Sequence, residues 1–95
     1  MIKTVYKYPL LVANISGEFD VLSTKVPASH RIVHLGLDPV GQTCIWCEVD
    51  PDAAPDTELD FIRVGTGWTI DLDIFEYVNT IFQDIYVWHF YVKKQ

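Results

Sequence analysis

A long hydrophobic run, a surplus of basic residues and a framework of cysteines are all absent from this sequence of 95 residues. No stretch approaches the roughly 20 apolar residues that a membrane-spanning helix needs. The first residues alternate between apolar and polar types and lack the apolar core of a signal peptide. We therefore expect a cytoplasmic protein with no segment in the membrane.

Basic residues are scarce. Lysine and arginine number 7 against 13 acidic residues, so the formal net charge is −6. A protein that binds nucleic acid needs a basic face to neutralise phosphates, so we expect no such binding. One stretch without any Lys or Arg contains the acids Asp50, Asp52, Asp56, Glu58 and Asp60. It is either a solvated acidic loop or a surface that docks on a basic partner.

The only two cysteines, Cys44 and Cys47, form a single C-x-x-C pair. Residues three apart on a strand face opposite sides, so these two sulfurs cannot share a metal ion, and we expect two buried, reduced thiols. The histidines His30, His34 and His89 lie on separate segments without the spacing of metal ligands. We predict no catalytic residues, no metal site and no cofactor, and we do not expect an enzyme.

Aromatic residues, in contrast, make up 14% of the chain, and alternation of apolar and polar residues is its main pattern. The pattern predicts strands over residues 4–12 with a break or bend at Pro9, then 19–24, 31–37, 43–49 and 58–64. Strands at this spacing are typical of a small antiparallel sandwich or barrel. We predict a single all-β domain, residues 1–95, of six to seven strands with at most one short helical turn.

The last third of the chain is harder to interpret. Spacing of apolar residues over residues 71–76 suits an irregular or helical turn that Asp71 could cap, while residues 77–83 suit a strand. The final segment, 85–93, is apolar on both faces, so it is buried inside the domain or against another copy. We predict a homo-oligomer whose interface is one face of this segment, formed by Tyr86, Trp88, Phe90 and Val92.

A strand that runs into a Gly-Thr-Gly corner is the most specific local feature. The residues are Arg63, Gly65, Thr66, Gly67 and Trp68. Backbone N–H groups at such a corner can bind an anion, arginine can bind a phosphate, and tryptophan can stack on a base. With Lys7 and Arg31, these residues are our predicted site for a small anionic ligand that contains a ring. The simpler interpretation is a β-bulge turn beside a surface arginine.

The chain resembles a family of short proteins from phages and prophages. The resemblance lies in residues 3–10 (KTVYKYPL), 44–51 (CIWCEVDP), 61–67 (FIRVGTG), 77–83 (YVNTIFQ) and 87–90 (VWHF), whose order and spacing agree over nearly the whole chain. The resemblance carries no catalytic set. It implies an accessory protein that counters bacterial defence in the cytoplasm of the infected host cell.

Two functions fit this setting. The first is an oligomeric sponge that sequesters a small nucleotide immune signal, which is the function we expect. The alternative is an acidic inhibitor that covers a nucleic-acid-binding surface of a host defence protein. Because a fold does not determine a function, both rest on the setting and on the residues named above.

Overall fold

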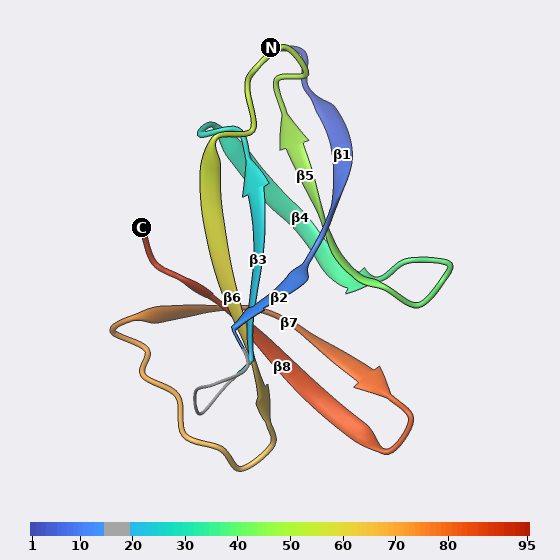
Figure 1. Cartoon of the computed structure of the whole chain (residues 1–95), viewed down its shortest axis with the longest axis vertical. Helices are drawn as coiled ribbons and strands as arrows, with labels where there is room; N and C mark the ends of the chain where they lie inside the picture. The colour runs from blue at the N-terminus through green and yellow to red at the C-terminus, as the bar shows by residue number, and fades with distance from the viewer. Residues whose placement is uncertain (15–19) are drawn as a thin grey trace.

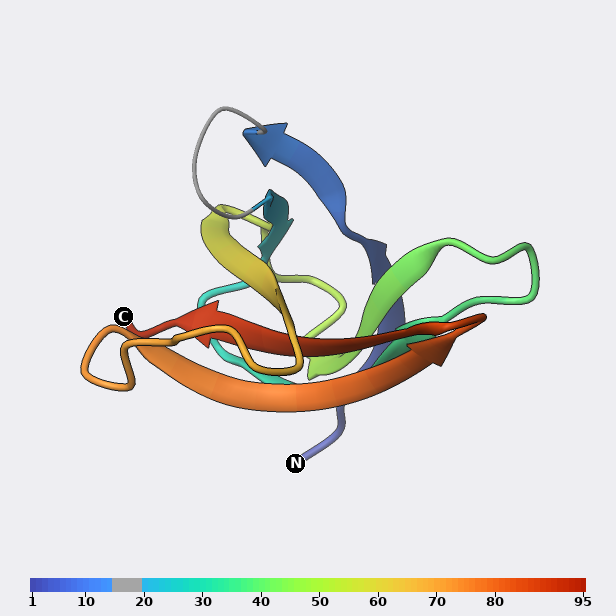
Figure 2. The same ribbon diagram turned by 90° about the horizontal axis from the view of Figure 1, so that it is seen from below.

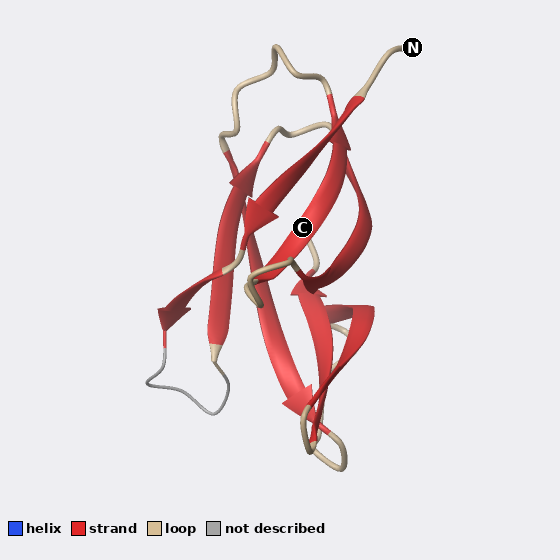
Figure 3. Cartoon of the chain, turned by 90° about the vertical axis from the view of Figure 1, so that its right-hand side faces the viewer, coloured by secondary structure: helices blue, strands red, loops and turns tan. Residues whose placement is uncertain are grey.

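A computed structural model describes residues 1–14 and 20–95 of the chain, and within these residues it contains strands and no helix (Figure 3). Figure 1 shows the strands in chain order: β1 (Thr4–Pro9), β2 (Leu11–Asn14), β3 (Val21–Val26), β4 (His30–Leu37), β5 (Thr43–Val49), β6 (Thr57–Gly65), β7 (Phe75–Gln83) and β8 (Tyr86–Lys93). The all-β prediction is confirmed. The described residues include no helix that could cross a membrane.

The strands form two antiparallel sheets. The three-stranded sheet has the order β1-β5-β4, and the five-stranded sheet has the order β2-β3-β6-β8-β7. The first predicted strand, 4–12, is in fact β1 and β2, because the chain leaves one sheet at Pro9 and enters the other at Leu11 (Figure 2). Leu10 between them is buried, and its N–H donates to the Thr43 carbonyl at 3.0 Å. This bend accounts for an eighth strand where the pattern predicted six to seven.

Residues 71–76 contain a single turn that leads directly into β7. The Phe75 N–H donates to the Asp71 carbonyl at 3.0 Å, and the Asp71 carboxylate accepts the Asp73 N–H at 2.9 Å. The chain then becomes a strand at Phe75. The ambiguity of this region is thus resolved in favour of one turn followed by a strand.

The core fills the space between the two sheets. On β5, Ile45, Cys47 and Val49 belong to the core cluster, whereas Cys44 lies on the other face of that strand. Both cysteines are buried and free, as predicted. Burial raises the pKa of the Cys47 thiol to about 11, so this thiol is protonated and inert at neutral pH.

The predicted interface on β8 needs correction. Phe90 is only 2% exposed and belongs to the core cluster, and Trp88 and Val92 pack against that cluster. Phe90 points from this face of β8 into the core between the two sheets, so the chain itself covers that part of the face, whereas Trp88 and Val92 remain partly exposed. Of the four residues predicted for the interface, only Tyr86 is exposed.

Two edge strands, β4 and β7, meet where the sheets approach each other. The Asn79 side chain donates to the Leu35 carbonyl across this seam at 2.6 Å. Both strands carry a register shift here, between Ile32 and His34 on β4 and between Tyr77 and Asn79 on β7. Bulges increase local twist and interrupt edge pairing, so the two edges do not join into one continuous sheet.

Candidate functional site

The Gly-Thr-Gly corner is a tight turn at the end of β6. The Trp68 N–H donates to the Gly65 carbonyl at 3.1 Å, and Gly67 has a φ of 93°, a conformation that favours glycine. A Cβ added to Gly65 would lie 3.0 Å from the Trp68 ring. The two glycines therefore shape the turn and let the indole lie against the backbone. Since the backbone N–H of Trp68 donates within the turn, this backbone group is not available to bind an anion.

Around this turn lies a cluster that we name the aromatic corner: Arg63, Trp68, Tyr86 and Trp88. The Trp68 and Trp88 rings meet edge to face at 6.0 Å, and Tyr86 stacks on Trp88 at 5.8 Å. The Arg63 guanidinium lies over Trp88, 4.7 Å from the ring centroid. The structure thus brings together the arginine and the tryptophan that the sequence nominated, and it adds Trp88 and Tyr86 to them.

The charge of Arg63 is already balanced. Its Nη2 donates to Asp20 Oδ2 at 2.8 Å, and both side chains are about one-third exposed. A hollow of about 70 Å³ lies between Asp20, Arg63, Trp68 and Trp88. Sites for small molecules typically span about 300–1,000 Å³, so one chain alone offers a shallow contact surface here rather than a complete pocket.

Thr66 was predicted to join Arg63 in the anion site, but its side chain contacts His89 instead. Its Oγ1 lies 2.9 Å from His89 Nε2, and Thr80 Oγ1 lies 3.0 Å from His89 Nδ1. Tyr77 extends the chain of hydrogen bonds to Thr80 at 2.6 Å. Successive residues of a strand face opposite sides, so His89 and Thr66 lie across the sheet from Trp88. Thr66 therefore holds the turn against the sheet and does not join the aromatic corner.

Lys7 and Arg31 lie elsewhere, which corrects the prediction that they join Arg63 in one site. Both belong to the three-stranded sheet, where Lys7 pairs with Asp38 at 3.0 Å and Arg31 pairs with Glu48 at 3.0 Å. Arg31 and Glu48 are directly opposite each other on β4 and β5. Lys7 is thus paired with a carboxylate of the β4–β5 turn, and Arg31 with a carboxylate of the neighbouring strand.

Asp38 organises the turn between β4 and β5. Its side chain is 3% exposed, and its Oδ1 accepts the N–H groups of Gln42 at 2.9 Å and Val40 at 3.0 Å. Its Oδ2 accepts from Lys7 and faces the Cys44 thiol at 3.7 Å. The hydrogen bond from Gln42, followed by that from Lys7, lowers the pKa of the Asp38 carboxyl. These contacts hold the turn between β4 and β5 in place and tie it to β1 through Lys7.

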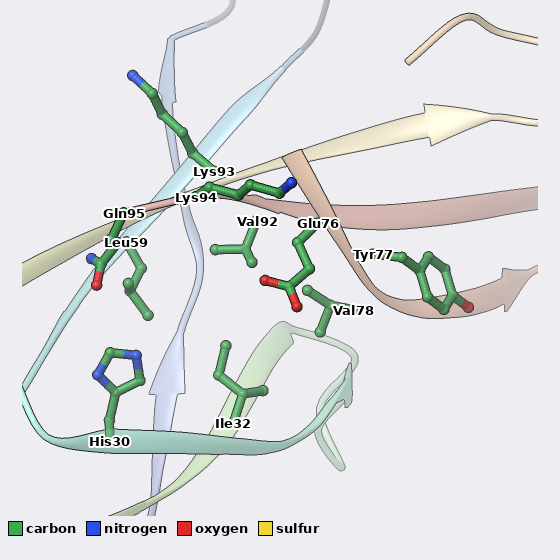
Figure 4. A pocket seen from close by; sticks show the side chains of 10 residues that line it. All are labelled: His30, Ile32, Leu59, Glu76, Tyr77, Val78, Val92, Lys93, Lys94 and Gln95. Atoms are coloured by element: carbon green, nitrogen blue, oxygen red, sulfur yellow. The ribbon is translucent and has the colours of Figure 1, made fainter. Parts of the chain in front are cut away.

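A larger cavity lies at the seam between β4 and β7, away from every residue that the sequence nominated except Val92. Its volume is about 430 Å³. Figure 4 shows it between the strands, lined by His30, Ile32, Leu59, Glu76, Tyr77, Val78, Val92, Lys93, Lys94 and Gln95. Because these residues come from four strands and the segment after β8, no local pattern in the sequence marks them. We name this cavity the seam pocket.

A second exposed feature is the end of the β7–β8 hairpin. Ile85 is 88% exposed, and Tyr86 beside it connects through Trp88 to the half-exposed Trp68. Phe82, 78% exposed, is paired with Val87 and therefore lies on the other face of the hairpin. Large apolar side chains that remain exposed together mark a surface for association. We name Trp68, Ile85 and Tyr86 the hairpin surface.

The described residues, 1–14 and 20–95, contain no group of three or more His, Cys, Asp or Glu side chains placed to hold a metal ion. The interactions that the candidate sites offer a ligand are therefore aromatic stacking, apolar contact and single charged groups.

Comparison with known proteins yields one family. No curated protein and no solved structure matches the chain. The sequence matches a domain family over residues 1–95, its whole length. The chain therefore belongs to the family described as a domain of unknown function, DUF7352.

Proposed function

We propose that this protein is a binding protein without chemistry of its own, which sequesters a small anionic nucleotide at the aromatic corner. The observation that carries the proposal is the arrangement of Arg63, Trp68 and Trp88 around one hollow. Stacking of a base on an aromatic side chain contributes about 1–3 kcal/mol, and arginine binds phosphate through two parallel hydrogen bonds. Both types of contact are within reach of one ligand at this corner.

Asp20 sets the condition for binding. It occupies the Arg63 guanidinium at 2.8 Å, so a phosphate must displace the carboxylate or share the guanidinium with it. The pair is about one-third exposed, and ion pairs near the surface contribute little to stability. Replacement of the Asp20 carboxylate by a phosphate at Arg63 therefore costs little free energy.

A second copy of the chain completes the site in this proposal. The hollow of one chain is several times smaller than a small-molecule site, and the hairpin surface lies beside it. If two hairpin surfaces meet, their aromatic side chains add walls to the hollow. The oligomer would then be the binding unit, which suits a sponge that removes a nucleotide immune signal, as the resemblance to phage proteins implies.

Titration with a panel of cyclic and ADP-ribose-type nucleotides, followed by tryptophan fluorescence, tests this proposal. We expect quenching that is reduced in Trp68→Phe, where Trp88 remains at the hollow, and retained in full in the matched control Trp46→Phe, because Trp46 lies in the other sheet against His34. Arg63→Gln is expected to weaken binding about tenfold or more, the effect of losing a charged hydrogen bond.

Asp20→Asn separates this proposal from a purely structural ion pair. Removal of the competing carboxylate should tighten nucleotide binding, whereas a structural role predicts only lower stability. Absence of quenching by every nucleotide in the panel would contradict the proposal.

The exposed acidic loop between β5 and β6 favours a second candidate, an inhibitor that docks on a basic partner. Residues 50–56 are exposed, and none of the three ion pairs in the described chain uses an acid of this loop. Figure 1 places the loop at the opposite end of the molecule from the β7–β8 hairpin. This function predicts salt-sensitive capture of one basic protein, which is lost when Asp50, Asp52, Asp56 and Glu58 are neutralised together.

A further inference from the structure

The seam pocket is open for a structural reason. The bond from Asn79 to the Leu35 carbonyl ties β7 to β4, while the pocket lies toward the start of both strands, between His30 and Ile32 on one side and Glu76 to Val78 on the other. The register shifts on β4 and β7 fall at Ile32–His34 and Tyr77–Asn79, between the pocket and that bond. The two edges are thus separate along the pocket, which remains as a cleft of about 430 Å³, within the usual range for small ligands.

The floor of the pocket is apolar. Ile32, Val78 and Val92 are half-buried and pack against the core, and Leu59 is itself a core residue. Figure 4 shows these four side chains around a common space, with the Tyr77 ring directed away from it. A ligand that fills the pocket therefore needs an apolar body the size of a ring or a short branched chain.

Glu76 is the charged side chain that is directed toward this space. In Figure 4 its carboxylate lies beside Val78, with its oxygens toward the cavity. None of the three ion pairs of the described residues involves Glu76. Its two oxygens are acceptors that a ligand with an N–H donor can use.

The basic residues at the rim of the pocket are hydrogen-bonded to the backbone or are directed away from the pocket. The Lys94 ammonium donates to the Leu72 carbonyl at 2.9 Å, and the Lys93 side chain extends away from the pocket in Figure 4. His30 faces the pocket, but its Nδ1 is 2.9 Å from the Pro27 carbonyl, which leaves Nε2 as its polar atom toward the ligand.

We propose that the seam pocket binds a small amphipathic cation, a primary amine on an apolar body, with the ammonium on Glu76 and the body against Ile32, Val78 and Val92. This site is separate from the aromatic corner and takes a ligand of opposite charge. It therefore does not depend on the nucleotide proposal and can succeed or fail independently of it.

A titration of the full chain with 2-phenylethylamine, followed by backbone amide chemical shifts in NMR, tests this inference. We expect the largest shift changes at Ile32, Val78 and Val92, and small changes at Trp68 and Trp88. The acid of similar size, 3-phenylpropionate, and the neutral 2-phenylethanol are expected to bind at least about fivefold more weakly, because they lack the charge-assisted hydrogen bond to Glu76.

Glu76→Gln keeps the size of the side chain and removes its charge, and because Glu76 is exposed the variant is expected to fold. It should weaken binding of the amine about fivefold. The matched control Glu58→Gln makes the same change on an exposed residue outside the pocket and should leave binding unchanged.

Two results would overturn the inference. Binding of 3-phenylpropionate as tight as that of the amine would show that the lysines, not Glu76, select the ligand. Saturating amine without shift changes at the pocket residues would show that the cavity is only a gap between two sheet edges.

Discussion

Phe90→Ala is expected to lower the free energy of unfolding by about 3–5 kcal/mol, the usual cost of deleting a buried phenyl ring. Phe90 is 2% exposed and lies in the core between the two sheets. The same change at Phe82 removes a ring that is 78% exposed, so it should alter stability by less than about 0.5 kcal/mol. Urea unfolding of both variants measures the difference.

The pair of variants separates two explanations for the apolar face of β8: packing in the core of one chain, and contact with another copy of the chain. If β8 used Phe90 to contact another copy, as its sequence pattern suggested, Phe90→Ala would change oligomeric state with little effect on the unfolding of the single chain. A loss of stability at Phe82 as large as that at Phe90 would contradict the described packing of the hairpin.

Asp38→Asn is expected to destabilise the protein at neutral pH. It is also expected to make the free energy of unfolding depend less on pH in the acid range. Hydrogen bonds from Gln42 and Lys7 lower the pKa of Asp38 in the folded state. The unfolded chain, with an aspartate pKa of about 3.9, therefore binds the proton more readily. The contribution of Asp38 is fully present above that value and is lost as the pH falls through the lower pKa of the folded state.

Urea midpoints of the wild type and Asp38→Asn between about pH 2 and pH 7 measure this effect. The two curves should converge in acid, because a protonated aspartate and an asparagine carry the same charge. Asp52→Asn is the matched control, since Asp52 is exposed and makes none of the three ion pairs described. Parallel curves for wild type and Asp38→Asn would contradict the lowered pKa.

Alternation along the chain predicted that the described structure is built from strands, and it predicted where most of them lie. It placed Cys44 and Cys47 on opposite faces of one strand, and the structure shows both thiols buried and free. It did not distinguish β1 from β2, because Leu10 continues the apolar pattern while the backbone changes sheets there. Local pattern predicts which residues are extended, but the identity of a strand's neighbours depends on distant parts of the chain.

The candidate site was predictable only where its residues are close in sequence. Arg63, Gly65 and Trp68 come together because a tight turn joins them. Lys7 and Arg31 were grouped with Arg63 by charge alone, and their carboxylate partners come from loops and strands that only the topology reveals. The seam pocket was missed for the same reason, since its walls come from β4, β6, β7 and β8.

The central claim is that a second copy completes the aromatic corner through the hairpin surface. Native mass spectrometry of the wild type and of Ile85→Lys tests it most directly, because Ile85 is 88% exposed and a charge there should block association without loss of the fold. We predict an oligomer with bound nucleotide for the wild type, and a folded monomer without nucleotide for the variant. A wild-type monomer, or an oligomer that Ile85→Lys leaves intact, would contradict the account.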